Sequence, residues 1–145
     1  MQSRDEPGAA RADNAAMPAY CVGLAKGAYG DLSGARAVVL GASYRGVVKE
    51  TAFSGVFGTV GALKAEGAVV TVHDPMYTGD ELRSLGFEPH TLGIDVDLAV
   101  LQSDQAEYTD LSVKDLPGVK VIIDGRRILD AGAFPDVRLL VVGKA

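Results

Sequence analysis

Tryptophan is absent from this sequence of 145 residues, and cysteine occurs once, at Cys21. A single cysteine excludes an intramolecular disulfide and a zinc site built from several cysteine thiolates. No apolar run approaches the roughly 20 residues that cross a bilayer as a helix, and the N-terminus lacks the apolar core of a signal peptide. We therefore expect a cytoplasmic protein with no membrane association, in which Cys21 serves packing.

Positive charge is also scarce. Lys and Arg number 14 against 19 Asp and Glu, which gives a formal net charge of -5. Non-specific nucleic-acid binding relies on clustered Lys and Arg, so nucleic acid is not expected as a partner. The two histidines, His73 and His90, are far apart in sequence and show no metal-ligand spacing, so no metal site is predicted.

Apolar strands alternate with helical segments through most of the chain. This alternation predicts right-handed crossovers and a mainly parallel sheet covered on both faces. The expected fold is α/β, a Rossmann-like three-layer sandwich with a sheet of about five strands, preceded by a helical lead-in. The expected strands are Ala35–Gly41, Val69–His73, Asp97–Leu101, Val119–Asp124 and Val137–Val142. The expected helices are Ser54–Glu66, Gly79–Leu85 and a short one that opens with the capping-box spacing of Asp104 and Glu107.

The first 16 residues are polar, rich in alanine and without an apolar face, so residues 1–16 are expected to be mobile or partly helical. Residues 17–145 form the predicted domain, and residues 17–30 are its helical lead-in. Pro18 suits the first turn of that helix. Its expected apolar stripe consists of Tyr20, Cys21, Leu24, Ala25 and Ala28.

The turn after the first expected strand carries an aromatic and a guanidinium, Tyr44 and Arg45. Open α/β sheets bind ligands at the carboxyl ends of their strands, where this turn lies. Gly41 and Gly46 are five residues apart, which fits neither the dinucleotide fingerprint nor the P-loop. A nucleotide bound here is therefore expected to be held by cationic side chains rather than by a glycine cradle.

The fourth expected strand ends in Asp124-Gly125-Arg126-Arg127, which places two more guanidinium groups at the same edge of the sheet. Cations that converge there in an acidic protein favour a diphosphate-sized anion site. Surface pairing is the alternative: Arg45 with Glu50 or Asp74, and one of the two arginines with Asp130. Asp74 closes the second strand, where either a ribose ligand or a turn-forming Asp-Pro fits; without the glycine fingerprint the turn is favoured. No complete catalytic set is recognised.

Five stretches in order resemble the C-terminal, nucleotide-binding domain of the UDP-glucose/GDP-mannose dehydrogenase family. Residues 38–51 resemble its Val-Leu-Gly-x-Ala-(Tyr/Phe)-Lys turn, and residues 123–130 its Asp-Gly-Arg segment. The other three are Asn14–Tyr20, similar to Asn-x-x-Met-Pro in the family's central helix, Gly67–Pro75, similar to the second strand and its Asp-Pro, and Asp97–Leu111. The resemblance extends over nearly the whole chain from Ala9 onward.

The resemblance implies a role in polysaccharide biosynthesis. Members of this family are NAD-dependent oxidoreductases that convert the C6 alcohol of a nucleotide sugar such as UDP-glucose to a carboxylate through a Cys nucleophile. Their last domain grips the nucleotide half of the substrate. The family's aromatic, Lys and Arg fall on Tyr44, Arg45 and Arg126, which would therefore bind the UDP-sugar. Arg127 and Glu50 are further possible members of that site.

This sequence also departs from the family. It shows neither the G-x-G-x-x-G of the NAD domain nor the segment with the catalytic Cys, and Cys21 follows the Asn-x-x-Met-Pro position. NAD is therefore expected to bind a missing N-terminal domain, and this chain alone is expected to be inactive. Residues 52–55 replace the family's usual Arg-Glu-Ser-Pro, and Gln102 stands where Thr is more usual.

The leading hypothesis is thus the UDP-sugar-binding domain of a nucleotide-sugar 6-dehydrogenase. The second is a free-standing, non-catalytic UDP-sugar-binding or regulatory module, which the altered residues 52–55 favour. A small NAD(P)-binding domain is a third hypothesis, disfavoured by the glycine spacing. The sugar and the choice between UDP and GDP stay open, and the isolated domain is expected to be a monomer or a weak homodimer.

Overall fold

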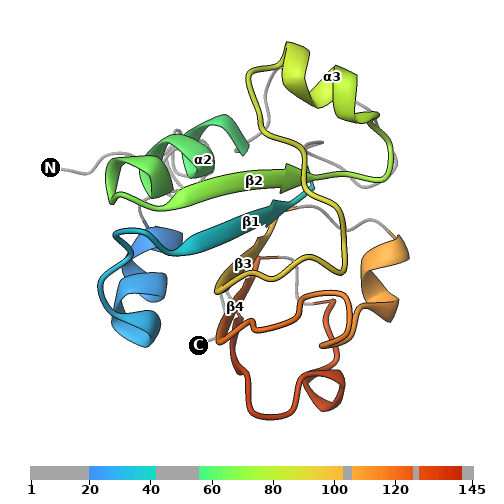
Figure 1. Ribbon diagram of the computed structural model, residues 1–145. Coiled ribbons are helices and arrows are strands. Elements are labelled where there is room, and N and C mark those ends of the chain that lie inside the picture. Colours follow the sequence, from blue (N-terminus) through green and yellow to red (C-terminus); the bar gives the residue numbers. More distant parts are fainter. Residues whose placement is uncertain (1–19, 42–55, 103–105, 126–127, 142–145) are drawn as a thin grey trace, which may run out of the picture.

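A computed structural model describes residues 20–41, 56–102, 106–125 and 128–141, and Figure 1 shows its architecture. The described strands form one sheet in which all neighbours are parallel, in the order β2-β1-β3-β4-β5. The parallel sheet of five strands and the Rossmann-like α/β class predicted from the sequence are confirmed. The strands are β1 (Arg36–Leu40), β2 (Val69–His73), β3 (Leu98–Leu101), β4 (Val121–Asp124) and β5 (Arg138–Val141).

The central strands consist almost entirely of apolar residues because both faces of the sheet are covered. In β1, Ala37 and Val39 face one core cluster while Val38 and Leu40 face the other. All four side chains are buried. Successive strand residues alternate between the faces, so one short apolar run supplies both cores.

One face of the sheet is covered by helix. Residues 20–29 are helical, and α2 (Val56–Ala65) packs beside them. Cys21 and Ala25 from the first helix and Val60 and Leu63 from α2 are buried in this core, as their spacing predicts. Tyr20 is 50% exposed, so its place in the predicted stripe was wrong; it is the first residue described in the helix.

The other face is covered by short 3₁₀-helices and loops. These are η1 (Ala106–Asp110) and η2 (Ala131–Ala133), together with the connections before β3 and β4. The short helix predicted here is η1, and it is 3₁₀ rather than α-helical; Asp104, at which it was predicted to open, lies outside the described residues. Its Tyr108 is fully buried in this second core, where a large aromatic supplies much apolar surface in a short segment.

The crossover from β2 to β3 begins with α3 (Gly79–Ser84), which follows the arrowhead of β2 in Figure 1. Thr78 caps α3: its side chain accepts from the Glu81 N–H at 3.1 Å, and the Glu81 carboxylate accepts from the Thr78 N–H at 2.9 Å. This reciprocal capping box stabilises a helix too short to persist alone. The chain then pairs Pro89 with Val72, which covers the outer edge of β2.

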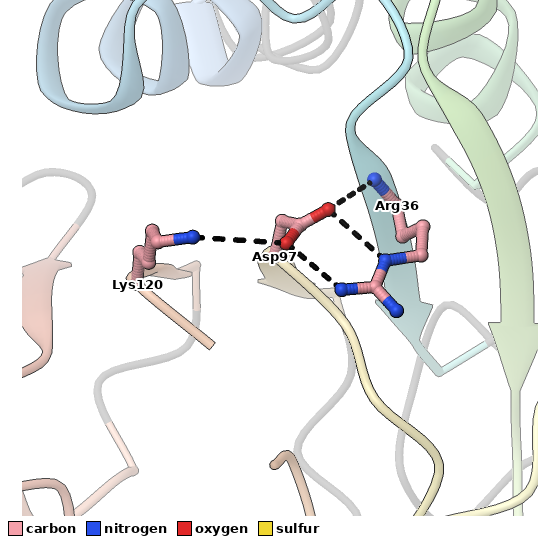
Figure 2. A network of polar contacts seen from close by, with 3 residues as sticks. All are labelled: Arg36, Asp97 and Lys120. Carbon is pink, nitrogen blue, oxygen red and sulfur yellow. Dashed lines mark hydrogen bonds and ion pairs between the residues drawn. The ribbon is translucent and has the colours of Figure 1, made fainter. Parts of the chain in front are cut away.

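A polar network ties three strands together at the amino-terminal edge of the sheet (Figure 2). The buried Asp97 accepts from the Arg36 backbone N–H at 2.9 Å and from its guanidinium at 3.2 and 3.1 Å. Lys120 Nζ lies 4.0 Å from the same carboxylate. Hydrogen bonding to Arg36 is the main cause that lowers the pKa of Asp97. In the described part of the chain, no helix is long and apolar enough to cross a membrane.

Candidate functional site

The carboxyl ends of the three central strands lie level with one another. Leu40 of β1 is in register with Leu101 of β3, and Leu101 with Asp124 of β4. Neighbouring strands are about 4.8 Å apart, so Leu40 and Asp124, two strands apart, are separated by roughly 10 Å. The chain therefore leaves β1 and β4 at one edge, within the span of a diphosphate and its sugar.

A glycine directly follows β1 and another directly follows β4, for different reasons. Gly41 follows β1 with a φ of 106°, a left-handed conformation that glycine adopts without strain. A Cβ on Gly125, after β4, would lie 2.6 Å from the Leu101 carbonyl oxygen. The Gly125 N–H donates to that oxygen at 3.0 Å. The backbone after β4 is thereby held against the end of β3.

The site residues predicted from the sequence lie outside the described residues. Tyr44, Arg45 and Glu50 fall within residues 42–55, and Arg126 with Arg127 fills the gap between Gly125 and Ile128. Their roles stay predictions. What the structure does place is the end of β1 before the first segment and the end of β4 before the second, at the same edge of the sheet.

A tyrosine–histidine pair, which the sequence did not single out, joins η1 to the end of β2. The Tyr108 hydroxyl donates to the His73 carbonyl oxygen at 2.9 Å and lies 2.9 Å from His73 Nδ1. With its proton used on the carbonyl, the hydroxyl accepts from a protonated Nδ1. The Gly41 N–H also donates to the His73 carbonyl, at 2.7 Å. One carbonyl thus links the ends of β1, β2 and η1.

Both groups of this pair are uncharged at neutral pH. Burial lowers the pKa of His73, against the opposing charges of Asp74 and Glu107. Burial likewise raises the pKa of Tyr108. The pair therefore acts through hydrogen bonds, which hold η1 to the end of β2 at the carboxyl edge of the sheet.

Two buried aspartates close the turns that follow their strands. The Asp74 Oδ1 accepts from the Met76 N–H at 2.7 Å, which confirms the turn-forming interpretation of Asp-Pro. The Asp124 Oδ2 accepts from the Leu129 N–H at 2.9 Å. This second bond joins Asp124 to Leu129, the residues on either side of the segment in which Arg126, a predicted binding residue, lies.

Thr59 and Gln102 form another polar contact that the sequence alone did not reveal. Thr59 lies in α2 with no exposed surface, and its hydroxyl donates to the Gln102 side-chain oxygen. Gln102 directly follows β3, and its N–H donates to the Leu40 carbonyl at 2.9 Å. Two features of the sequence could have pointed to this contact: a hydroxyl within an otherwise apolar helix, and a polar residue directly after a strand.

Two further groups lie away from this edge. Cys21 is buried in the helix-covered core, and burial raises the pKa of its thiol to about 11, so it is a packing thiol. His90 Nδ1 lies 3.1 Å from the Thr71 hydroxyl, and burial lowers the pKa of His90. Among the described residues, the carboxyl edge of the sheet offers hydrogen-bonding groups and no paired acid and base, which suits binding rather than catalysis.

The profile of the UDP-glucose/GDP-mannose dehydrogenase family, UDP binding domain, matches residues 38–131. This range runs from β1 to η2 and includes the exits of β1 and β4. No match was found among curated proteins.

Solved structures of nucleotide-sugar dehydrogenases share the fold. The UDP-N-acetyl-mannosamine dehydrogenase of Staphylococcus aureus superposes with a TM-score of 0.73 at 29% identity, over 92% of this chain and 32% of that one. The UDP-D-ManNAc dehydrogenase of Pyrococcus horikoshii superposes with a TM-score of 0.72 at 26% identity, over 98% of this chain and 35% of that one. The UDP-glucose dehydrogenase of Pyrobaculum islandicum superposes with a TM-score of 0.72 at 25% identity, over 89% of this chain and 30% of that one. The chain spans about a third of each of these proteins.

Proposed function

Since the chain belongs to the UDP-glucose/GDP-mannose dehydrogenase family, through its UDP-binding domain, we propose that it binds the nucleotide half of a UDP-sugar. The catalysis served by this binding is the NAD-dependent oxidation of the sugar C6 alcohol to a carboxylate. The family match over residues 38–131 carries the proposal. The level carboxyl ends of β1, β3 and β4 support it, because ligands of open α/β sheets bind at such an edge.

Arg45 and Arg126 neutralise the diphosphate in this proposal, and Tyr44 packs against the nucleotide or the sugar. Arg127 and Glu50 are secondary members of the site. The closely held backbone at Gly125 supports the assignment of Arg126, since that residue follows directly. Residues 17–145 form the binding domain in this proposal: residues 17–30 are the end of a helix like the family's central helix, and residues 1–16 precede it.

NAD is assigned to a separate N-terminal domain of the dehydrogenase. Residues 1–145 contain no G-x-G-x-x-G fingerprint. Asp74, at the position of a ribose-binding carboxylate, uses one oxygen in its own turn. The residues present therefore do not fit NAD, and no step of the oxidation is assigned to this chain.

Calorimetric titration of the purified chain with UDP-glucose, with NAD in parallel, tests the proposal. Saturable binding of UDP-glucose is expected, and Arg45→Ala and Arg126→Ala should each weaken it at least about tenfold, as loss of a charged hydrogen bond does. Arg138→Ala is the matched control, because Arg138 lies at the amino end of β5, opposite the carboxyl edge at which the ligand is proposed to bind. Binding of NAD alone would contradict the proposal.

A free-standing, non-catalytic UDP-sugar-binding module is the second candidate. The replacement of the family's usual Arg-Glu-Ser-Pro by residues 52–55 favours it. Mixing this chain with UDP-glucose, NAD and the catalytic half of a relative distinguishes the two. NADH formation that depends on this chain supports the dehydrogenase, and binding without any NADH supports the module. As an isolated chain we propose a monomer or a weak homodimer.

A further inference from the structure

Gln102 lies where the order of the strands in the sheet reverses. From β1 the chain passes through α2 to β2 on one side, whereas β3 lies on the other side of β1. The gap between the carboxyl ends of β1 and β3 is therefore the topological switch point, where open α/β sheets form their ligand crevice. The Gln102 N–H is bonded to Leu40 across this gap, so its side chain starts from a fixed position.

The orientation of the Gln102 amide is determined by Thr59. Thr59 has no exposed surface, and its hydroxyl proton is donated to the Gln102 side-chain oxygen. That oxygen is the amide's only acceptor atom, while its nitrogen carries two N–H donors. With the oxygen directed at Thr59 of α2, both N–H donors of the NH₂ group are left for a ligand.

The NH₂ group is accessible to a ligand. Gln102 is half-buried. The Gln102 nitrogen has no hydrogen-bond partner among the described residues, and His90 Nε2 is the only described polar side-chain atom that is both buried and without a partner. The Gln102 nitrogen is therefore not fully buried and keeps contact with solvent. A polar group at a strand exit that is oriented by a buried hydroxyl, yet open to solvent, is prepared for binding at little further entropic cost.

We propose that Gln102 is a ligand-binding residue that donates its amide N–H to an acceptor oxygen of the bound nucleotide, and that Thr59 is its positioning residue. This inference rests on the proposed function, since the acceptor belongs to the UDP half of the sugar nucleotide. The acceptor is an oxygen of the diphosphate or a carbonyl of the base. A neutral donor there adds directional contact to the charge supplied by the predicted arginines, because an amide has fixed N–H directions.

Titration of the 145-residue chain with UDP tests this assignment. Gln102→Leu removes the donor and is expected to weaken binding about tenfold. Gln102→Glu keeps an acceptor for Thr59 but replaces the donor with a negative charge, so it should weaken binding by more than Leu does. Thr59→Val, which is similar in shape, should cost about threefold, and Thr59→Ser should restore affinity because it keeps the hydroxyl.

The NMR signals of the Gln102 side-chain NH₂ give a readout that a purely structural role does not affect. They should shift on saturation with UDP in the wild type and in Thr59→Ser. In Thr59→Val they should move already without ligand, because the oriented amide is released. Uridine serves as the second ligand: a Gln102→Glu effect confined to UDP assigns the diphosphate oxygen, and an equal effect on uridine assigns the base.

The failure of this inference is separable from that of the proposed function. If the wild type binds UDP and the folded Gln102→Glu and Gln102→Leu variants bind it equally well, the role of Gln102 is wrong while UDP binding stands. If the wild type shows no saturable binding, the proposed function itself fails, and this inference with it. Thermal unfolding of each variant establishes that it is folded.

Discussion

At the scale of single residues, polar groups at the two edges of the sheet have different tasks. At the amino edge, Asp97 receives three hydrogen bonds from Arg36 and lies close to Lys120, so its charge is balanced within the fold. At the carboxyl edge, His73, Tyr108 and Gln102 are neutral groups that join strand ends. The ion pairs of the amino edge thus stabilise the fold, whereas the groups of the carboxyl edge, which also include the turn-closing Asp74 and Asp124, hold the strand ends together.

The charge of Asp97 is expected to contribute to stability. Its folded pKa is lowered, so this contribution is present above the unfolded pKa of about 3.9 and is lost as pH falls through the folded value. Asp97→Asn should therefore lower the free energy of unfolding by about 1 kcal/mol at pH 7. The difference should vanish in strongly acidic solution. Urea denaturation at several pH values measures both.

Asp80→Asn is the control for this substitution. Asp80 also pairs with an arginine, Arg83 at 3.1 Å, but its side chain is 96% exposed. Solvent screens such a pair, so little change in stability is expected. An Asp97→Asn variant as stable as Asp80→Asn at pH 7 would show that the amino-edge network contributes nothing measurable.

At the scale of elements, two glycines differ in how closely the neighbouring backbone approaches them. Gly125 follows β4 and lies against β3, whereas Gly61 is exposed within α2, where an added Cβ would have no neighbouring atom within 4 Å. The same change to alanine therefore meets two different environments. This contrast tests whether the exit of β4 is built by steric contact.

Gly125→Ala and Gly61→Ala are predicted to act in opposite directions. A Cβ on Gly125 would press on a backbone carbonyl, so the free energy of unfolding should fall by about 1–3 kcal/mol. Gly61→Ala should raise it by about 0.5–1 kcal/mol, because alanine favours the helix. Denaturant unfolding of the two variants decides, and equal effects of the same sign would refute the role given to Gly125.

At the scale of the whole molecule, both histidines lie with β2 and are held neutral. His73 is bonded to Tyr108, and His90 contacts Thr71 of β2 while its segment pairs with the edge of that strand. Burial lowers the pKa of both, and for His90 the positive charge that His73 carries when protonated adds to the effect. Protonation of either ring therefore opposes folding.

Global stability should consequently fall in mildly acidic solution. Since both folded pKa values lie below the unfolded value of 6.5, the stabilisation is complete above pH 6.5 and is lost as pH falls through the folded values. Each histidine contributes a slope of at most about 1.4 kcal/mol per pH unit. Urea denaturation between pH 7.5 and about pH 5 should show this slope, and His73→Asn with His90→Asn should flatten it. An unchanged slope in the double variant would exclude the histidines as its cause.

The sequence by itself determined the elements and the family. Short apolar runs rich in valine and leucine, separated by glycine and Asp-Pro turns, predicted all five strands to within about two residues of their observed ends. These signals are local: strand and helix periodicity and turn chemistry depend on neighbouring residues. The family motifs at residues 38–51 and 123–130 were recognisable for the same reason. The binding roles of Tyr44, Arg45 and Arg126 remain predictions from those motifs.

Only the tertiary structure decided which distant groups meet. The strand order makes the β1–β3 gap the switch point. It brings Thr59 to Gln102 across 43 residues and His73 to Tyr108 across 35. The second core is built from 3₁₀ turns around Tyr108 rather than from a helix. Local propensity does not contain such information, because a contact between distant segments depends on the packing of the whole sheet.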